Sequence, residues 1–574
     1  MTRLPEDLYH TFTVAHSVVE LFHDLHAKLR FPVTPREKSR IITEKSLDYV
    51  PDPRGLGFEF YQSMLRNKNA VAQIDPTTNT SYTYDDLLLR SSRVCFNLLH
   101  MGITKDDTIC QCSVNHLDSS IPVISGFLLG LPVANLDPSL PLDDAIHILN
   151  KIRPRIMFVC NEGLKLMVDA IDEVDIDCAV VVFGSSYVED FIEFDTLVEE
   201  TDDEPAFKPL PIGDLHQTAV ILFSRGSSGP PKGVCLSYYT LLVQTVHAAE
   251  CWHLGEGFKV AMGFGSFHTL TALTLLICST MTGITRVVCE KFEPATTWKL
   301  VDKYDVSFII CTTQEVCELY TNETPEAVTG KSLKMLVTTG TSLRRVSLLE
   351  LRKRFPFCFI TNIYQNPEVG GALSMYNYNK PVDIRDQYQK PTSCGKLFPG
   401  ITIKIVDPIT EMTLSANTAG ELRYKADFKI NDHFKEESSN SDAKGWCKSG
   451  QIAMYDERRC IFVLGPYEDV FQYKCWHIVP SIVEAVLRSH VAVKDAVVIG
   501  KPHRNVLMGE KPMGIVSLNK GMKGRVTEQD LEEYANSILS NKQQLRAGVM
   551  IVSEIPYTLD GKPRRQEVKS LLFG

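Results

Sequence analysis

Short runs of apolar, often β-branched residues alternate with longer windows of helical spacing through most of the chain. Strand-like runs lie at 219–224, 286–290, 306–312 and 334–340, and helix-like windows lie at 240–252 and 347–355. The runs have the length of buried strands and end in turns, whereas the windows place apolar residues at helical intervals. Strand, helix and strand in this order predict a mainly parallel α/β sheet.

The pattern changes in the last third of the chain. From 401 to 464, short strands follow one another closely and are separated by polar turns, which is typical of an antiparallel β-rich subdomain. After 464, helix-like and strand-like windows alternate in a compact α+β arrangement. We therefore predict a boundary near 465, with one domain over 1–464 and a second over 465–574.

The longest apolar region, at 121–136, predicts a buried helix and strand. It contains two prolines and is too short to cross a bilayer comfortably, so we expect no transmembrane span. The N-terminus contains acidic residues and histidines and lacks the apolar run of a secretory signal. We therefore expect an intracellular protein.

Composition narrows the classes of function. The 574 residues, 44% of them apolar, exceed what one core usually supports and predict a multidomain globular protein. A formal net charge of −10 argues against nucleic acid or an anionic membrane as a partner, because both attract Lys and Arg, and favours small-molecule chemistry. The sixteen cysteines show neither a CxxC pair nor metal-ligand spacing, which favours reduced, mostly buried thiols. The composition leaves the oligomeric state open.

Residues 224–233, SRGSSGPPKG, form a glycine- and serine-rich stretch between a strand-like run and a helix-like window. Backbone N–H groups in such a turn can form an anion-binding concavity next to a helix N-terminus. Lys232 can add a positive charge, and Ser224, Ser227 and Ser228 can donate hydrogen bonds to phosphate oxygens. The spacing is not that of the ordinary P-loop, so the residues alone are compatible with both a structural turn and a phosphate loop.

The stretch ILFSRGSSGPPKGVCLS (221–237) resembles the signature of the adenylate-forming enzymes, the superfamily of acyl-CoA synthetases, 4-coumarate–CoA ligases and firefly luciferase. Six further segments resemble the family in the same order over nearly the whole chain. They are VTTGTSL (337–343), NIYQNPE (362–368), CGKLFPGITIKIVD (394–407), GELRYK (420–425), GWCKSGQIAMYDE (445–457) and QLRAGVMIVSEIPYTLDGKPRR (544–565). By these seven segments the chain is identified as a divergent member.

The resemblance implies a fold and a reaction. The fold is a large N-terminal domain of two α/β subdomains and a small β-barrel, followed by a small, mobile α+β C-terminal domain. In the reaction, a fatty or aryl carboxylic acid attacks ATP to form an acyl-adenylate, and coenzyme A then displaces AMP. ATP, Mg²⁺ and coenzyme A are the implied cofactors. Relatives are often peroxisomal, but the C-terminal SLLFG does not match the Ser-Lys-Leu address, so cytoplasm and peroxisome both stay open.

The resemblance also implies site residues. The catalytic residues would be Lys562, which reaches the reacting carboxylate and phosphate oxygens, and Lys232. The nucleotide would be held by Ser224, Arg225, Gly226, Ser227, Ser228, Gly229, Gly340, Tyr364 and Gln451. Glu368 would bind Mg²⁺, and the substrate or coenzyme A would meet Phe267, His268 and Lys474. Taken singly, each of these residues also fits a purely structural or solvent-exposed role.

Two departures from the family pattern fall at the phosphates. Arg225 stands where relatives carry a small hydroxyl residue or glycine, and its guanidinium either binds phosphate or fills the space that the nucleotide needs. Pro367 replaces a threonine and removes both a hydroxyl and a backbone N–H. Gln365, beside it, replaces a glycine and adds bulk near the adenine.

Further departures lie in the C-terminal third. Gln451 replaces an Asp that accepts hydrogen bonds from the ribose hydroxyls, at a cost of roughly 1 to 2 kcal/mol of binding. Gly465 and Pro466 replace the hinge Asp-Arg, and a proline there restricts the backbone. Gln472 replaces a lysine, although Lys474 is close by. The sequence thus supports two hypotheses, an acid–thiol ligase and a catalytically weakened or silent relative that binds a ligand or partner.

Overall fold

The structure is a computed structural model, in which two compact units are described separately. The described residues are 40–184, 191–200, 207–224, 230–321, 329–340, 343, 345–435, 441–474, 476–504, 508–557 and 563–573. The larger unit comprises 43–402 and 425–447, and the smaller unit comprises 403–424 and 448–574 together with the first 42 residues. The β-rich segment is thus divided between the units, and the boundary near 465 stays a prediction.

The first sheet of the larger unit has seven strands in the order β10-β9-β5-β4-β6-β7-β8, and its neighbours pair in parallel except for β9 and β10. The strands are β4 (Ile109–Cys112), β5 (Val133–Leu136), β6 (Ile156–Val159), β7 (Ala179–Val182), β8 (Ile192–Glu193), β9 (Thr218–Ser224) and β10 (Lys232–Ser237). Its helices are α3 (Tyr84–His100), α4 (Ser120–Leu129), α5 (Leu142–Ile152), α6 (Asn161–Val174) and α7 (Phe194–Leu197).

The second sheet also has seven strands, in the order β15-β14-β13-β11-β12-β2-β3, and only β2 and β3 pair antiparallel. The strands are β2 (Val71–Asp75), β3 (Thr80–Thr83), β11 (Val260–Gly263), β12 (Thr285–Val288), β13 (Phe308–Thr312), β14 (Met335–Thr339) and β15 (Phe359–Asn362). Two mainly parallel sheets confirm the predicted α/β class. The remaining helices of this unit are α2 (Leu56–Arg66), α8 (Tyr238–Cys251), α9 (Leu270–Thr282), α10 (Pro294–Lys303), α11 (Thr313–Thr321), α12 (Arg345–Arg354) and α13 (Pro381–Gln389).

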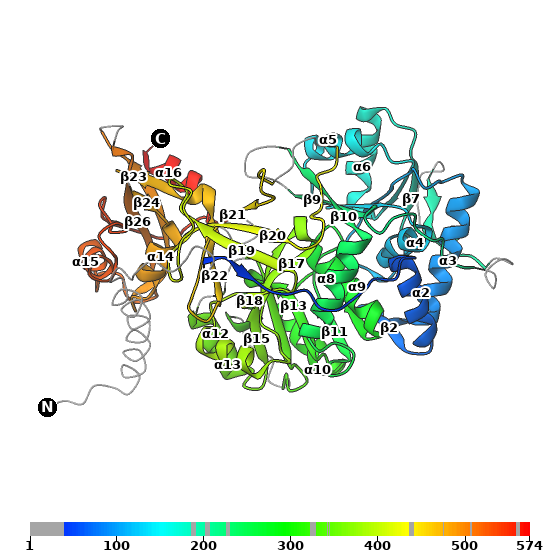
Figure 1. Ribbon diagram of the computed structural model, residues 1–574, viewed down its shortest axis with the longest axis horizontal. Coiled ribbons are helices and arrows are strands. Elements are labelled where there is room, and N and C mark those ends of the chain that lie inside the picture. Colours follow the sequence, from blue (N-terminus) through cyan, green and yellow to red (C-terminus); the bar gives the residue numbers. More distant parts are fainter. Residues whose placement is uncertain are drawn as a thin grey trace. The chain divides into compact units, whose positions relative to one another are not determined.

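Helices α4, α8 and α9 are buried on most of their faces, as expected for helices that pack inside an α/β unit. Every residue of α4 is buried, and β5 follows it, so the apolar region 121–136 is the buried helix and strand that its sequence predicts. Helices α2, α3 and α4 pack against one another along one side of the unit (Figure 1), where Phe60 meets Phe127 edge to face at 5.6 Å. Within the described residues, no helix is long and apolar enough to cross a membrane.

A small three-stranded sheet completes the larger unit. It consists of β16 (Tyr364–Asn366), β17 (Gly371–Met375) and β18 (Lys396–Leu397), with the 3₁₀ turn η4 (Pro367–Val369) between the first two strands. Strands β16 and β17 pair antiparallel. This sheet places the segment predicted to carry Mg²⁺ and adenine contacts on a tight hairpin.

The smaller unit contains most of a five-stranded sheet and an α+β part. The sheet order is β1-β19-β20-β21-β22, with β1 (Ile42–Thr43), β19 (Ile401–Val406), β20 (Gly420–Ala426), β21 (Cys447–Tyr455) and β22 (Ile461–Pro466). The α+β part has the turn η5 (Tyr467–Asp469), strands β23 (Phe471–Tyr473), β24 (Trp476–Ile478), β25 (Val493–Pro502), β26 (Glu510–Leu518) and β27 (Val549–Val552), and helices α14 (Pro480–Arg488), α15 (Glu528–Ile538) and α16 (Arg565–Phe573). The short strands and the α+β part agree with the sequence pattern.

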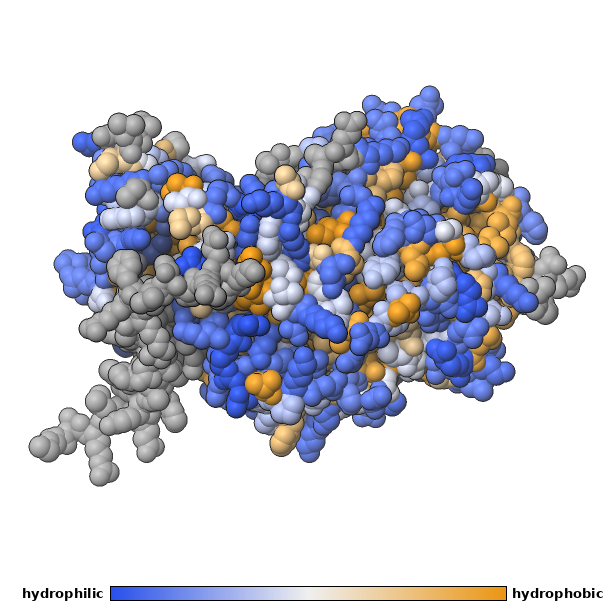
Figure 2. Space-filling view, viewed as in Figure 1, coloured by the Kyte–Doolittle hydropathy of each residue, from blue (hydrophilic) through white to orange (hydrophobic). Residues whose placement is uncertain are grey.

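Apolar residues are mostly buried within these elements. Figure 2 shows one face of the molecule, on which hydrophilic residues predominate and hydrophobic residues appear in separate groups. Each cysteine of the described residues is a free thiol, and most are buried. The cysteines thus occupy the positions of small core residues, as their scattered spacing predicts.

Candidate functional site

The predicted phosphate loop connects two antiparallel strands. Lys232, the first residue of β10, lies opposite Ser224, the last residue of β9, and residues 225–229 between them lie outside the described residues. The loop therefore leads into a strand, and α8 begins only at Tyr238. The expected helix N-terminus directly behind the loop is wrong, because Val234, Cys235 and Leu236 continue the pairing with β9.

Close packing explains the glycine after Lys232. A Cβ atom at Gly233 would lie 2.9 Å from the ring of Phe223 and 3.2 Å from the Cβ of Phe434. Such contacts are too short for any larger residue without movement of its neighbours. The exposed Lys232 is thus followed by a backbone position that is fixed between two aromatic side chains.

A segment from far along the chain lies beside β10. The N–H of Cys235 donates to the carbonyl of Asp432 at 2.9 Å, and the N–H of Phe434 donates to the carbonyl of Gly233 at 2.7 Å. The same segment reaches η4, because the N–H of Asn431 donates to the carbonyl of Glu368 at 2.8 Å. Residues 431–434 therefore bring the predicted cation ligand next to the strand that begins with Lys232.

Glu368 has a defined environment. Its N–H donates to the Oδ1 of Asn366 at 2.9 Å, which caps η4, and Pro367 occupies the first position of the turn, where a missing N–H costs least. Its Oε1 lies 3.7 Å from the Nε2 of His433, and both side chains are mostly buried. The described residues contain no cluster of three or more potential metal ligands, so a Mg²⁺ ion at Glu368 would need oxygen atoms from water or a phosphate.

His268 and Phe267 have different surroundings. Phe267 is buried, and the Arg286 guanidinium lies 5.5 Å from its ring centroid. The Nδ1 of His268 is 2.6 Å from the Oγ of Ser266, and its Nε2 is 3.7 Å from the Oδ2 of Asp137. Burial lowers the pKa of His268 and Asp137 partly opposes that shift, so the imidazole is neutral at pH 7.

A cavity of about 170 Å³ joins His268 to the two ends of the phosphate-loop hairpin. Its lining residues are Asn135, Leu136, Asp137, Leu140, Phe223, Pro231 and His268. Asn135 and Asp137 stand at the carboxyl end of β5 and just beyond it, where ligands bind in α/β sheets. The geometry therefore unites three segments predicted or positioned to contact ligand.

The predicted adenine contacts lie on separate elements. Tyr364 is half-buried on β16 opposite Ser374, and Gln365 accepts a hydrogen bond from the Oγ1 of Thr271 at 3.1 Å, which ties β16 to α9. Gly340 directly follows β14 with a φ of 90°, a conformation that favours glycine. Residues 341 and 342 lie outside the described residues.

In the smaller unit, two of the predicted departures face each other. Strands β21 and β22 pair antiparallel so that Gln451 lies opposite Pro466, and Ile452 lies opposite Gly465. Gln451 is half-buried, and its N–H donates to the Oγ of Ser449 at 3.1 Å. The replaced ribose contact and the replaced hinge residue thus belong to one local arrangement.

The β23–β24 hairpin holds Gln472 and Lys474. The Nε2 of Gln472 donates to the carbonyl of Lys474 at 2.8 Å, so the glutamine stabilises its own turn. The Lys474 Nζ lies 5.4 Å and 5.8 Å from the ring centroids of Tyr473 and Trp476. Cys475 and the predicted catalytic Lys562 lie outside the described residues, as do Arg225, Gly226, Ser227, Ser228 and Gly229.

Sequence reasoning missed Asn135, Asp137, Asn431 and His433. Asp137 carried a usable signal, because it directly follows a buried strand of a parallel sheet. His433 carried none, because it stands in a polar stretch almost two hundred residues after β10 and reaches that strand only through folding. Its backbone bridge to Val234 is a property of the fold alone.

Comparisons with known proteins agree with the seven sequence segments. Residues 60–428 match the family described as AMP-binding enzyme, and residues 482–562 match the AMP-binding enzyme C-terminal domain. The luciferin 4-monooxygenase of Nipponoluciola cruciata is 26% identical, over 89% of this chain and 93% of its own. The 4-coumarate-CoA ligase 1 of Narcissus pseudonarcissus is 25% identical, over 94% of this chain and 97% of its own.

A solved structure is similar as well. The luciferase-like enzyme from the nonluminescent Zophobas morio mealworm is 30% identical and superposes with a TM-score of 0.69, covering 74% of this chain and 99% of that one.

Proposed function

The chain belongs to the AMP-binding enzyme family, and from this premise we propose that it is an ATP-dependent acid–thiol ligase for a fatty or aryl carboxylic acid. The observation that carries the proposal is the placement of the strand that starts at Lys232 and the turn that carries Glu368 beside one shared segment of the larger unit. Backbone hydrogen bonds from residues 431–434 hold both the strand that starts at Lys232 and the turn that carries Glu368. A positive charge and a carboxylate on elements joined in this way suit the binding of a nucleotide phosphate with a cation.

In the first step, a carboxylate oxygen of the acid attacks the α-phosphorus of ATP. The bond from that phosphorus to the bridging oxygen breaks, and pyrophosphate leaves with the negative charge. Lys232 lies at the end of the loop predicted to hold the β- and γ-phosphates, where its charge stabilises the leaving group. Glu368 would hold Mg²⁺, which would neutralise phosphate charge, and Lys562 would stabilise the carboxylate and α-phosphate oxygens as they react.

In the second step, the thiol of coenzyme A attacks the acyl carbon. The bond from that carbon to the adenylate oxygen breaks, AMP leaves, and the thiol proton passes to solvent. Phe267 and His268 would lie near the acid, and a neutral His268 can accept or donate a hydrogen bond without attracting a second anion. Tyr364, Gly340 and Gln451 would contact the adenosine, and Lys474 would serve the second step.

A second candidate is a relative that binds its ligand with little or no turnover. It is favoured by the position of Gln451 opposite Pro466, since the first replaces a ribose contact and the second a hinge residue of the family pattern. The lost charge assistance lowers nucleotide affinity, and a proline in β22 fixes the backbone where the family has its hinge. Retention of Lys232 and Glu368 favours the ligase over this alternative.

Pyrophosphate exchange into ATP tests the proposal. Purified protein is assayed with Mg²⁺ and a panel of fatty and aromatic acids. We expect acid-dependent exchange that is lost in Lys562→Ala and retained in Lys542→Ala, an exposed lysine of the same unit. Absence of exchange with every acid, together with absence of a thermal shift on adding ATP, would refute the ligase.

A further inference from the structure

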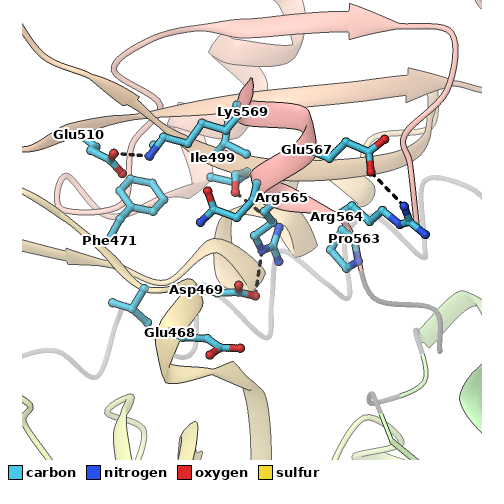
Figure 3. Close-up of a pocket in the computed structure, with 14 residues that line it drawn as sticks. Glu468, Asp469, Phe471, Ile499, Glu510, Pro563, Arg564, Arg565, Glu567 and Lys569 are labelled. Atoms are coloured by element: carbon cyan, nitrogen blue, oxygen red, sulfur yellow. Dashed lines mark hydrogen bonds and ion pairs between the residues drawn. The ribbon is translucent and has the colours of Figure 1, made fainter. Parts of the chain in front are cut away.

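Two neighbouring arginines follow the segment that ends at Lys562, and their environments differ. Arg564 is half exposed and pairs with Glu567 at 3.2 Å. The Arg565 side chain is 14% exposed and pairs with Asp469 at 2.9 Å and with Glu484. Figure 3 shows Arg565 directed toward Asp469, whereas Arg564 is directed toward Glu567. Only one of the two arginines thus connects α16 to other elements of the unit.

The partners of Arg565 belong to a larger ionic network. Glu484 is nearly fully buried on α14, and it also accepts from Arg488 at 3.3 Å and from the N–H of Val498 at 2.9 Å. The Nε of Arg488 donates to Asp495 at 2.8 Å. Burial alone would lower the pKa of Arg565, but Glu484 and Asp469 outweigh it and the pKa is raised. The guanidinium is therefore charged and is bound by two carboxylates.

The same network reaches the other side of the Lys562 segment. The hydroxyl of Tyr557 donates to Asp495, which is already bound to Arg488. Tyr557 and Pro563 form an antiparallel bridge, and the N–H of Arg564 donates to the carbonyl of Pro556 at 3.0 Å. The two described ends of the segment therefore lie side by side, and each is attached to the network.

Asp469 extends the network to a further element. It is the last residue of η5, which directly follows Gly465 and Pro466 at the end of β22. Residues 563 and 564, which directly follow Lys562, form the base of the Lys562 segment. Arg565 thus connects this base to the turn next to the predicted hinge. The contact lies wholly within the smaller unit.

A cavity of about 530 Å³ surrounds these contacts. It could be a ligand-binding site instead of a structural ion network. Its basic side chains are already paired with carboxylates that line the same cavity. The pairs are Arg565 with Asp469, Arg564 with Glu567, and Lys569 with Glu510 (Figure 3). A charged ligand would have to break these pairs. The cavity is therefore better explained as the solvent-facing side of the ionic network than as a ligand site.

We infer that the Arg565–Asp469 ion pair positions the base of the segment that carries Lys562. The inference rests on the proposed function, in which Lys562 contacts the reacting groups. Arg565 and Asp469 touch neither substrate nor nucleotide in this account and act through Lys562. Small displacements of a reacting group reduce catalysis strongly. Fixing the end of the segment that carries Lys562 should therefore increase the rate of the reaction.

The test removes Asp469, the less buried partner of the pair. Asp469→Ala breaks the contact while Glu484 keeps Arg565 paired, Asp469→Glu is the conservative rescue, and Arg564→Ala is the matched control. In Asp469→Ala we expect faster hydrogen exchange of the Arg564 and Arg565 amides and a kcat for adenylation lower by about tenfold, with an unchanged KM for ATP. Asp469→Glu should recover most of both effects, and Arg564→Ala should show neither.

The two readouts separate this inference from the proposed function. A wild-type protein without adenylation for any acid contradicts the function, and hydrogen exchange then decides the role of the ion pair. Unchanged exchange of the two amides in Asp469→Ala overturns the inference, whether or not the protein is active. An equal loss of kcat in Arg564→Ala overturns it as well.

Discussion

At the scale of single residues, the departures from the family pattern change the side-chain chemistry of the predicted site more than its local backbone. Gln451 occupies a half-buried position on β21 with its N–H bonded to Ser449, and compared with the Asp of the family pattern it lacks the charge and is one methylene longer. Pro367 fits the first position of η4, where its missing N–H does not disturb the turn. Both changes therefore leave the local backbone intact, and we expect them to act on ligand contacts.

Restoring the charge at 451 should tighten nucleotide binding. Gln451→Asp replaces a neutral acceptor by a charged one, and a gain of about 1 to 2 kcal/mol corresponds to about 5-fold to 30-fold in the Kd for ATP. Isothermal titration calorimetry measures the change. Gln529→Asp adds the same charge on exposed α15 and should leave the Kd unchanged. Equal affinity of wild type and Gln451→Asp would show that this side chain is not a ribose contact.

His247 gives the larger unit an acid-sensitive position. It is 1% exposed on α8, neither ring nitrogen has a hydrogen-bond partner within the described residues, and burial lowers its pKa from 6.5 to about 4. Between these two pH values the unfolded chain binds a proton that the folded chain excludes. Stability therefore falls as pH falls, by about 2 kcal/mol from pH 7 to pH 5.

His247→Phe should remove that acid sensitivity. The Phe398 ring centroid lies 5.5 Å from that of His247, so an aromatic ring suits the site. Urea unfolding at pH 7 and pH 5 should show a smaller loss of stability on acidification in the variant, by about 2 kcal/mol. If wild type and variant lose the same amount, His247 is not the group that takes up the proton.

At the scale of elements, the sequence predicted strands and helices where the apolar pattern was long and regular. The windows at 219–224 and 240–252 became β9 and α8, and both elements are buried over most of their length. The element that sequence reasoning missed is β10, whose six residues were read as part of the approach to a helix. Its identity depends on pairing with β9 and on backbone bonds to residues 432 and 434, which local sequence does not reveal.

The ion pair between the start of α16 and α14 yields a stability prediction. Arg565→Met leaves the buried Glu484 carboxylate with less compensation and should lower the free energy of unfolding of the smaller unit by about 3 to 5 kcal/mol. Arg564→Met removes an exposed pair and should change it by less than about 1 kcal/mol. Hydrogen exchange of α14 amides in increasing urea measures both. Equal free energies of unfolding in the two variants would contradict a stabilising role of Arg565.

At the scale of the whole molecule, the order of the motifs along the chain indicated the family more strongly than any single motif. Seven segments in register indicated the family, and the matches over 60–428 and 482–562 confirm it. The site was predicted less completely, because His433 reaches it from a segment with no signature of its own, and Asp137 is marked only by its place directly after a strand. Folding brings these side chains to Glu368 and His268, and contacts between distant segments are not encoded in local spacing.

The central claim is that the chain forms an acyl-adenylate. The most direct measurement supplies fatty and aryl acids with ¹⁸O in both carboxylate oxygens, together with ATP, Mg²⁺ and coenzyme A, and analyses the nucleotide products by mass spectrometry. Attack of the carboxylate on the α-phosphorus transfers one carboxylate oxygen to AMP, so the account predicts AMP that carries a single ¹⁸O. Nucleotide products without the label, with every acid supplied, would contradict it.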